Sequence, residues 1–226
     1  DLGCGYGALA TVVLRAPGML ALPVPLGEVG AAVRVTVWND EVAAYDMGDG
    51  AAQWFSDFLG QPLRLVRFDP GQKRLASAQW TAGIAAPAAF ADEYPLLVIS
   101  QASLDELNRR IAANGDTPVA MPRFRPNLVL DGLDAHGEDD LDEVCFNTPE
   151  GAVRLKLVKP CARCSIPDVD PLTAERGHAV GDALAAYRAD ARVGGALTFG
   201  MNAVIVEGLD CTLRSGMVGG ATYRFD

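Results

Sequence analysis

Residues 161–173 read Cys-Ala-Arg-Cys-Ser-Ile-Pro-Asp-Val-Asp-Pro-Leu-Thr, so two thiols stand three positions apart with an arginine between them. A free cysteine has a pKa near ~8.5, and an adjacent guanidinium favours the thiolate, which is the form that binds metals or acts as a nucleophile. The motif indicates soft-metal or redox chemistry. By itself it is compatible with zinc, with dithiol exchange or with a single metal-bound thiolate.

The rest of the chain argues against the first two of these uses. A structural zinc site needs two further ligands, whereas His136 and His178 are isolated and the other three cysteines form no second pair. A thioredoxin-like dithiol begins a helix, and here Pro167 and Pro171 interrupt any helix that would follow the motif directly.

Composition sets the broad class. The chain has 226 residues, half of them hydrophobic, and a net charge of −10, which predicts one or two globular domains and no nucleic-acid partner. No apolar run approaches the ~20 residues of a membrane span. Five scattered cysteines favour a reducing, cytoplasmic compartment over a secreted disulfide framework. The chain begins with Asp1, and we expect an N-terminally truncated fragment.

Short strand-like runs dominate, which predicts an α+β, mainly β architecture built on β-barrels with flanking helices. Turn residues at 69–72 suggest a partial N-terminal domain at 1–70 and a second domain at 71–226. The expected strands cover residues 11–14, 20–24, 33–38, 63–68, 96–99, 128–130, 153–158 and 203–206.

Three helices are expected, at residues 50–59, 103–111 and about 179–187. The second would begin with Ser103 as N-cap and Glu106 completing a capping box. The acidic run 138–143 lacks the ligand spacing and the glycine of a calcium loop, so we interpret it as a charged surface turn.

Two further segments suggest ligand binding. Residues 1–7, Asp-Leu-Gly-Cys-Gly-Tyr-Gly, look like the glycine motif of S-adenosylmethionine-dependent methyltransferases, but no strand precedes them and no alternating strand-helix pattern follows. Residues 123–130, Arg-Phe-Arg-Pro-Asn-Leu-Val-Leu, place two arginines and an asparagine before a strand. Such an edge suits a phosphate, because arginine binds phosphate bidentately, although exposed charges at a strand end would look the same.

Taken in order, these motifs resemble the MOSC-domain molybdenum proteins, in particular the mitochondrial amidoxime-reducing components and their bacterial counterparts. The resemblance runs from about Val33 onward. It rests on residues 46–54, 63–66, 94–103, 125–127, 161–173 and 197–202.

The resemblance implies a role for each motif residue. Cys164 would be the molybdenum ligand and Cys161 a supporting core residue, while Asp92 would stand beside the metal as a proton donor. Cofactor-binding residues would be Arg125, Asn127, Arg163 and Asn202. The family's N-terminal strand with a Lys-Ser pair is missing here, and Met201 stands where the family often has glutamine.

The function implied is a molybdenum-cofactor-dependent oxidoreductase that reduces N-hydroxylated compounds, such as hydroxylamines and amidoximes, to amines. Because no flavin or iron-sulfur motif is present, electrons would come from a separate flavin reductase or ferredoxin-like protein. Two alternatives remain: a module that binds the cofactor or carries sulfur without turnover, and the methyltransferase suggested by residues 1–7.

Overall fold

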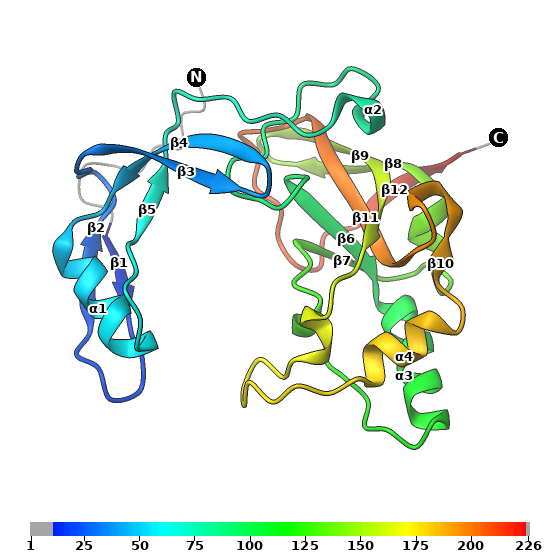
Figure 1. Cartoon of the computed structure of the whole chain (residues 1–226). Helices are drawn as coiled ribbons and strands as arrows, with labels where there is room; N and C mark the ends of the chain where they lie inside the picture. Colours follow the sequence, from blue (N-terminus) through cyan, green and yellow to red (C-terminus); the bar gives the residue numbers. More distant parts are fainter. Residues whose placement is uncertain (1–10, 225–226) are drawn as a thin grey trace. The chain divides into compact units, whose positions relative to one another are not determined.

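The computed structural model describes residues 11–224, which fold into a mainly β protein, as expected (Figure 1). It contains the three expected α-helices and a fourth, short one at Ala78–Thr81. By its internal contacts the described chain divides into two compact units. The first contains residues 11–74 and 89–92, and the second residues 75–88 and 93–224. The glycine motif at 1–7 lies outside the described residues. Within these residues, no helix is long and apolar enough to cross a membrane.

The first unit contains a β-hairpin, a three-stranded antiparallel sheet of order β3-β4-β5, and one helix. The helix α1 ends at Gly60, whose φ of 69° is the left-handed conformation that glycine adopts without strain. The elements are β1 (Thr11–Leu14), β2 (Leu22–Pro25), β3 (Ala32–Val37), β4 (Asp40–Asp46), α1 (Asp49–Leu59) and β5 (Val66–Phe68).

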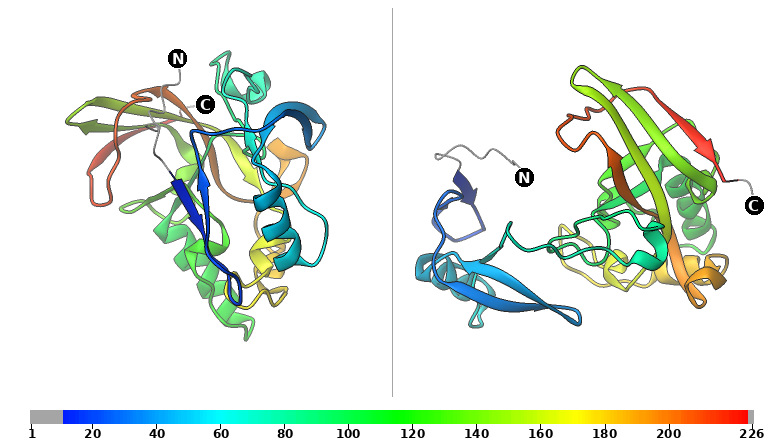
Figure 2. Two further views of the ribbon diagram at one scale, coloured as in Figure 1. Left: turned by 90° about the vertical axis from the view of Figure 1, so that its left-hand side faces the viewer. Right: turned by 90° about the horizontal axis from the view of Figure 1, so that it is seen from above.

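The second unit is built on a seven-stranded sheet that curls into a half-barrel, with the order β12-β8-β9-β11-β6-β7 and β10 paired to β11. Its pairs are antiparallel except β6 with β7, and the long β8–β9 pair stands out in Figure 2. The strands are β6 (Leu96–Ser100), β7 (Leu128–Leu130), β8 (Leu141–Thr148), β9 (Gly151–Ala162), β10 (Ala189–Asp190), β11 (Ala196–Glu207) and β12 (Gly219–Tyr223). The helices are α2 (Ala78–Thr81), α3 (Gln101–Ala113) and α4 (Ala179–Ala185).

Alternation along β6 divides the core of this unit between the two faces of the sheet. Leu97 and Ile99 face α3 and α4, where they pack with Leu107 and Phe199, while Val98 belongs to the cluster inside the half-barrel. Successive side chains of a strand point to opposite faces, so this one strand contributes to both clusters.

The structure corrects two sequence interpretations. Helix α3 begins one turn before Ser103, because Ser100 is the N-cap and its hydroxyl accepts from the backbone N–H of Ser103 at 3.1 Å. The acidic run 138–143 is no surface turn: Glu138 is fully buried, and the strand β8 begins at Leu141. The Glu138 carboxylate accepts from Ser103 Oγ at 2.7 Å and from the backbone N–H of Ser100 at 3.2 Å, which satisfies a buried polar group.

His136, beside this buried carboxylate, predicts a pH dependence of stability. Burial lowers the pKa of its imidazole to about 4, and neither ring nitrogen has a hydrogen-bond partner among residues 11–224. The unfolded chain binds this proton near pH 6.5 and the folded chain only near pH 4, so stability falls as the pH falls through this window. The loss is at most about 1.4 kcal/mol per pH unit.

Urea unfolding of the protein and of His136→Asn between pH 4 and 7 measures the contribution of His136 to the loss of stability on acidification. Asparagine tolerates the positive φ of 63° at this position and does not titrate, so the variant should lose less stability on acidification. Parallel pH profiles for the two proteins would contradict the prediction.

Candidate functional site

The cysteine motif lies where β9 leaves the sheet. Cys161 is the last residue but one of β9. Two positions later, the backbone N–H of Arg163 donates to the carbonyl of Leu197 on β11 at 2.8 Å. This bond extends the β9–β11 pairing one residue beyond the strand. Cys164 comes next and is exposed. The sheet thus fixes the first thiol and Arg163, and presents the second thiol on the loop that follows.

The two thiols have different surroundings. Cys161 is partly buried against the helix-side core, and its sulfur accepts from Arg163 Nη1 at 3.2 Å. Burial raises the pKa of the Cys161 thiol, and the Arg163 charge only partly opposes this effect. Because the thiolate is the metal-binding form, the raised pKa makes the Cys161 thiol a poorer metal ligand than an ordinary cysteine. Cys164 has no hydrogen bond to another part of the described chain.

Arg163 connects the motif to the segment before β7. Its Nη2 donates to the carbonyl of Phe124 at 3.1 Å, and its guanidinium carbon lies 5.6 Å from the centre of the Phe124 ring. Its Nε is buried and has no partner among the described groups. An unpaired buried donor costs about 1–3 kcal/mol, so this N–H is available to an acceptor that binds here.

A second arginine fastens the same two segments together. Arg123, at the end of a 3-10 turn, forms an ion pair with Asp170 at 2.9 Å and donates to the carbonyl of Pro167 at 3.3 Å. The pKa of Asp170 is lowered, first by the backbone N–H of Leu172 and also by Arg123. The sequence suggests that Arg123 binds an anion together with Arg125. In the structure, Arg123 instead holds the loop after the cysteine motif through Asp170 and Pro167.

Arg125 and Asn127 follow on the same segment. Arg125 has a left-handed backbone conformation, with φ 55°, is exposed, and forms no ion pair among the described residues. Asn127 extends the sheet: its backbone N–H donates to the Leu97 carbonyl at 2.9 Å, and its Oδ1 accepts from the Leu97 N–H at 2.8 Å. Only its side-chain N–H₂ remains for a ligand.

Asn202 is brought to the same region by β-sheet register. It lies on β11 opposite Leu97 of β6 on one side and Lys159 of β9 on the other, and it is almost completely buried. Leu97 is therefore the common neighbour of Asn127 and Asn202. Within the second unit, the four expected cofactor residues and both thiols thus come from three places: the end of β9 with the loop after it, the middle of β11, and the segment before β7.

Lys159 is a cation that sequence reasoning missed. Its ammonium group pairs with Glu93 at 2.6 Å and lies 5.9 Å and 5.7 Å from the ring centres of Trp80 and Tyr94. It stands two positions before Cys161 on β9, and its charge opposes the rise in the pKa of that thiol. The period-2 spacing of residues 159 and 161 was the available signal, because such residues share a face of a strand.

Asp92, the expected proton donor, belongs to the first unit. Its side chain is exposed, and its carbonyl accepts from Arg74 Nη2 at 2.9 Å. Arg74 also pairs with Asp40 at 2.7 Å and donates to the carbonyl of Ala89 at 3.1 Å, so it fixes the loop that carries Asp92.

Two family models match the chain. The model of the MOSC domain covers residues 86–215, and the model of the MOSC N-terminal beta barrel domain covers residues 6–62.

The chain is also similar to several curated proteins. Mitochondrial amidoxime-reducing component 1 of Homo sapiens is 37% identical over 158 residues, which are 68% of this chain and 44% of that protein. Mitochondrial amidoxime reducing component 2 of Bos taurus is 36% identical over 72% of this chain and 47% of its own length. Molybdenum cofactor sulfurase of Bos taurus is 28% identical over 75% of this chain and 20% of its own length. The chain thus spans less than half the length of these relatives.

Proposed function

Because the chain belongs to the MOSC domain family, we propose that it binds a molybdenum cofactor and reduces N-hydroxylated compounds to amines. The observation that carries the proposal is the contrast at the cysteine motif. One thiol, Cys161, is partly buried and held by Arg163, while the next, Cys164, is exposed and unengaged beside a buried guanidinium N–H without a partner. The relatives named as amidoxime-reducing components support the choice of reaction.

The residues present fit such a cofactor. Molybdenum prefers soft ligands, which a thiolate provides, and Cys164 is the accessible thiol. A pterin phosphate is bound well by a cation that donates two hydrogen bonds to it. Arg125 can do this, because it is exposed and forms no ion pair among the described residues. The orphaned Nε of Arg163 and the free side-chain N–H₂ of Asn127 add donors, and Asn202 adds a polar group on β11.

In this proposal the cofactor supplies two-electron redox chemistry when it is bound, and the protein supplies binding and protons. Reduction of R–NHOH to R–NH₂ and water takes up two electrons and two protons. Asp92 would donate a proton, and the exposed guanidinium of Arg125 would attract anionic groups. Electrons would reach the site from a separate flavin reductase or ferredoxin-like protein.

The deciding experiment measures molybdenum and pterin content after expression with an active cofactor supply, followed by reduction of a hydroxylamine with a chemical electron donor. Stoichiometric molybdenum and amine formation would support the proposal. Cofactor bound without amine formation would favour a cofactor-binding or sulfur-transferring module, a second candidate that the match to a molybdenum cofactor sulfurase supports. Absence of both molybdenum and pterin would refute both.

The two arginines should contribute separately to cofactor retention. Arg125→Ala and Arg163→Ala are each expected to weaken cofactor binding by about 1–3 kcal/mol, the range of hydrogen bonds to charged groups. Cofactor occupancy after dialysis against graded dilution measures the effect. Arg109→Ala is the matched control, because Arg109 is an exposed arginine on α3 paired to Glu106.

Only one of these variants should also change the stability of the cofactor-free protein. Arg163→Ala removes the bond to the Phe124 carbonyl, whereas Arg125→Ala removes an exposed side chain. Wild-type occupancy in both variants would speak against an anion-binding edge.

A further inference from the structure

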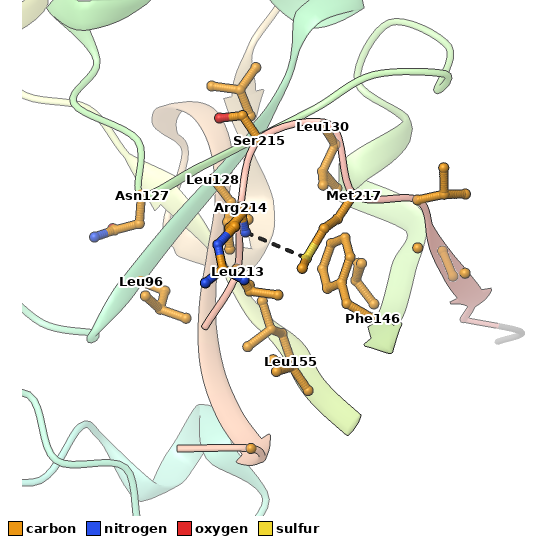
Figure 3. Close-up of a pocket in the computed structure, with 18 of the residues that line it drawn as sticks. Leu96, Asn127, Leu128, Leu130, Phe146, Leu155, Leu213, Arg214, Ser215 and Met217 are labelled. Carbon is orange, nitrogen blue, oxygen red and sulfur yellow. Dashed lines mark hydrogen bonds between the residues drawn. The ribbon is translucent and has the colours of Figure 1, made fainter. Parts of the chain in front are cut away.

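The interior of the half-barrel holds a cavity of about 980 Å³, on the face of the sheet away from α3 and α4 (Figure 3). Most of its lining is aliphatic or aromatic. It comes from residues 127–133, from the segment 208–221, and from individual positions on β6, β8, β9 and β11. Representative lining side chains are Leu96, Val144, Phe146, Leu155 and Ile205. This volume lies in the upper part of the range for small-molecule sites, which are mostly apolar with a few polar groups.

The cavity is distinct from the proposed cofactor site. Asn127 lines it, but Cys164, Arg163 and Arg125 do not. As shown above, the Oδ1 of Asn127 is already bonded to the backbone of Leu97. Of these four residues, Asn127 alone is common to the cavity and the proposed cofactor site.

The segment that follows β11 brings one cation to this apolar space. The backbone N–H of Arg214 lies 3.5 Å from the Met217 sulfur, and the Met217 N–H donates to the Arg214 carbonyl at 3.3 Å, so residues 214–217 form a turn. Figure 3 shows the Arg214 side chain among the apolar lining, with Leu96 on one side in this view and Phe146 on the other.

The charge of Arg214 is not neutralised by an ion pair. Within residues 11–224, no carboxylate lies within 4 Å of its guanidinium. The charge of Arg214 is the smallest of the causes that lower the pKa of Glu150. Asp131, the acidic residue of the lining, accepts a bond from the adjacent Gly132 N–H at 2.8 Å. A guanidinium beside an apolar surface favours an anionic partner that can form a bidentate pair.

We propose that this cavity binds an amphipathic carboxylate, with its hydrocarbon chain among the apolar side chains of the lining and its carboxylate on Arg214. The chain length then sets the affinity, because burying each methylene contributes about 0.8 kcal/mol, which is roughly a fourfold gain in affinity. Arg214 is exposed, so its guanidinium stands at the open side of the apolar lining, and pairing with it fixes the orientation of the carboxylate.

Calorimetric titration with probes of one chain length and different head groups tests both parts. Decanoate, decanol and decylamine are compared below their micellar concentrations, with octanoate and dodecanoate as the length series. We expect saturable binding of decanoate, a rise of roughly fourfold per methylene, and weaker binding of decanol. Arg214→Gln should weaken decanoate binding about 2–5-fold, the range for a solvent-exposed ion pair, and leave decanol binding unchanged.

Arg109→Gln, a change of charge on the helix-side face, is the control and should bind decanoate as the unmodified protein does. The proposal is overturned by equal binding of decanoate and decanol, by preference for decylamine, or by the absence of saturable binding. Sedimentation of the free protein adds a further outcome: a dimer that excludes decanoate would mean that a second copy covers the cavity. Because none of these measurements involves molybdenum, their failure leaves the proposed reductase function unaffected.

Discussion

Cys164→Ser is expected to abolish molybdenum retention and leave the free energy of unfolding nearly unchanged. The thiol is exposed on the loop after β9 and has no hydrogen bond to another part of the described chain, so the fold does not depend on it. Serine has almost the same shape, but a hydroxyl is a poor ligand for a soft metal. Molybdenum per chain after identical loading, together with a urea unfolding curve, measures both halves of the prediction.

Cys161→Ser is the matched control, and its effects should be reversed. This thiol packs against the helix-side core and accepts from Arg163, so serine there should cost stability but retain most of the metal. Metal retained in Cys164→Ser and lost in Cys161→Ser would exchange the two roles. Loss in both variants would mean that the motif binds as a pair, in the manner of a dithiol site.

The thiol motif could be found from the sequence, but the surroundings of its residues could not. A C-x-R-C motif after a strand is local, and the structure places it at the end of β9. The hydrogen bond of the Asn127 side chain is not local: its Oδ1 accepts from the backbone N–H of Leu97, thirty positions earlier in the chain. The sequence shows an amide side chain before a strand. Only the fold shows that the oxygen of this amide is already hydrogen-bonded within the sheet.

The acidic run shows the same limit for the fold. Residues 138–143 are strongly charged, which indicates a solvated turn when each residue is judged by itself. In the structure, Asp142 pairs with Lys156 at 2.8 Å across the β8–β9 ladder, and Glu138 is held by serines from β6 and α3. Cross-strand partners make charge compatible with a strand, and they lie far away in the sequence.

The start of α3 was misplaced for a related reason. Ser100 and Ser103 both satisfy the local pattern of an N-cap, and the glutamate that suggested a capping box instead pairs with Arg109 and Arg110 at 2.7 Å each. Ser103 is held inside the helix by the buried Glu138 carboxylate. The tertiary contact thus decides between two equivalent caps.

Gly200→Ala should cause a large loss of stability in the second unit. Gly200 lies within β11 with φ 77°, at a register irregularity of the β9–β11 pairing. A Cβ there would meet the Ile99 side chain at 2.6 Å and the Val98 carbonyl at 2.7 Å. Ile99 is fully buried and the carbonyl belongs to β6, so neither neighbour can move cheaply.

We expect Gly200→Ala to lower the free energy of unfolding by about 2–5 kcal/mol, the sum of overpacking and left-handed backbone strain. Gly216→Ala separates the two contributions: its φ is 84°, yet no atom lies within 4 Å of the added Cβ, so only the strain of about 1–2 kcal/mol should appear. Urea unfolding of both variants gives the comparison. Equal losses would show that β11 and β6 can separate locally, and the close approach that places Asn202 opposite Leu97 would then not be a rigid feature of the sheet.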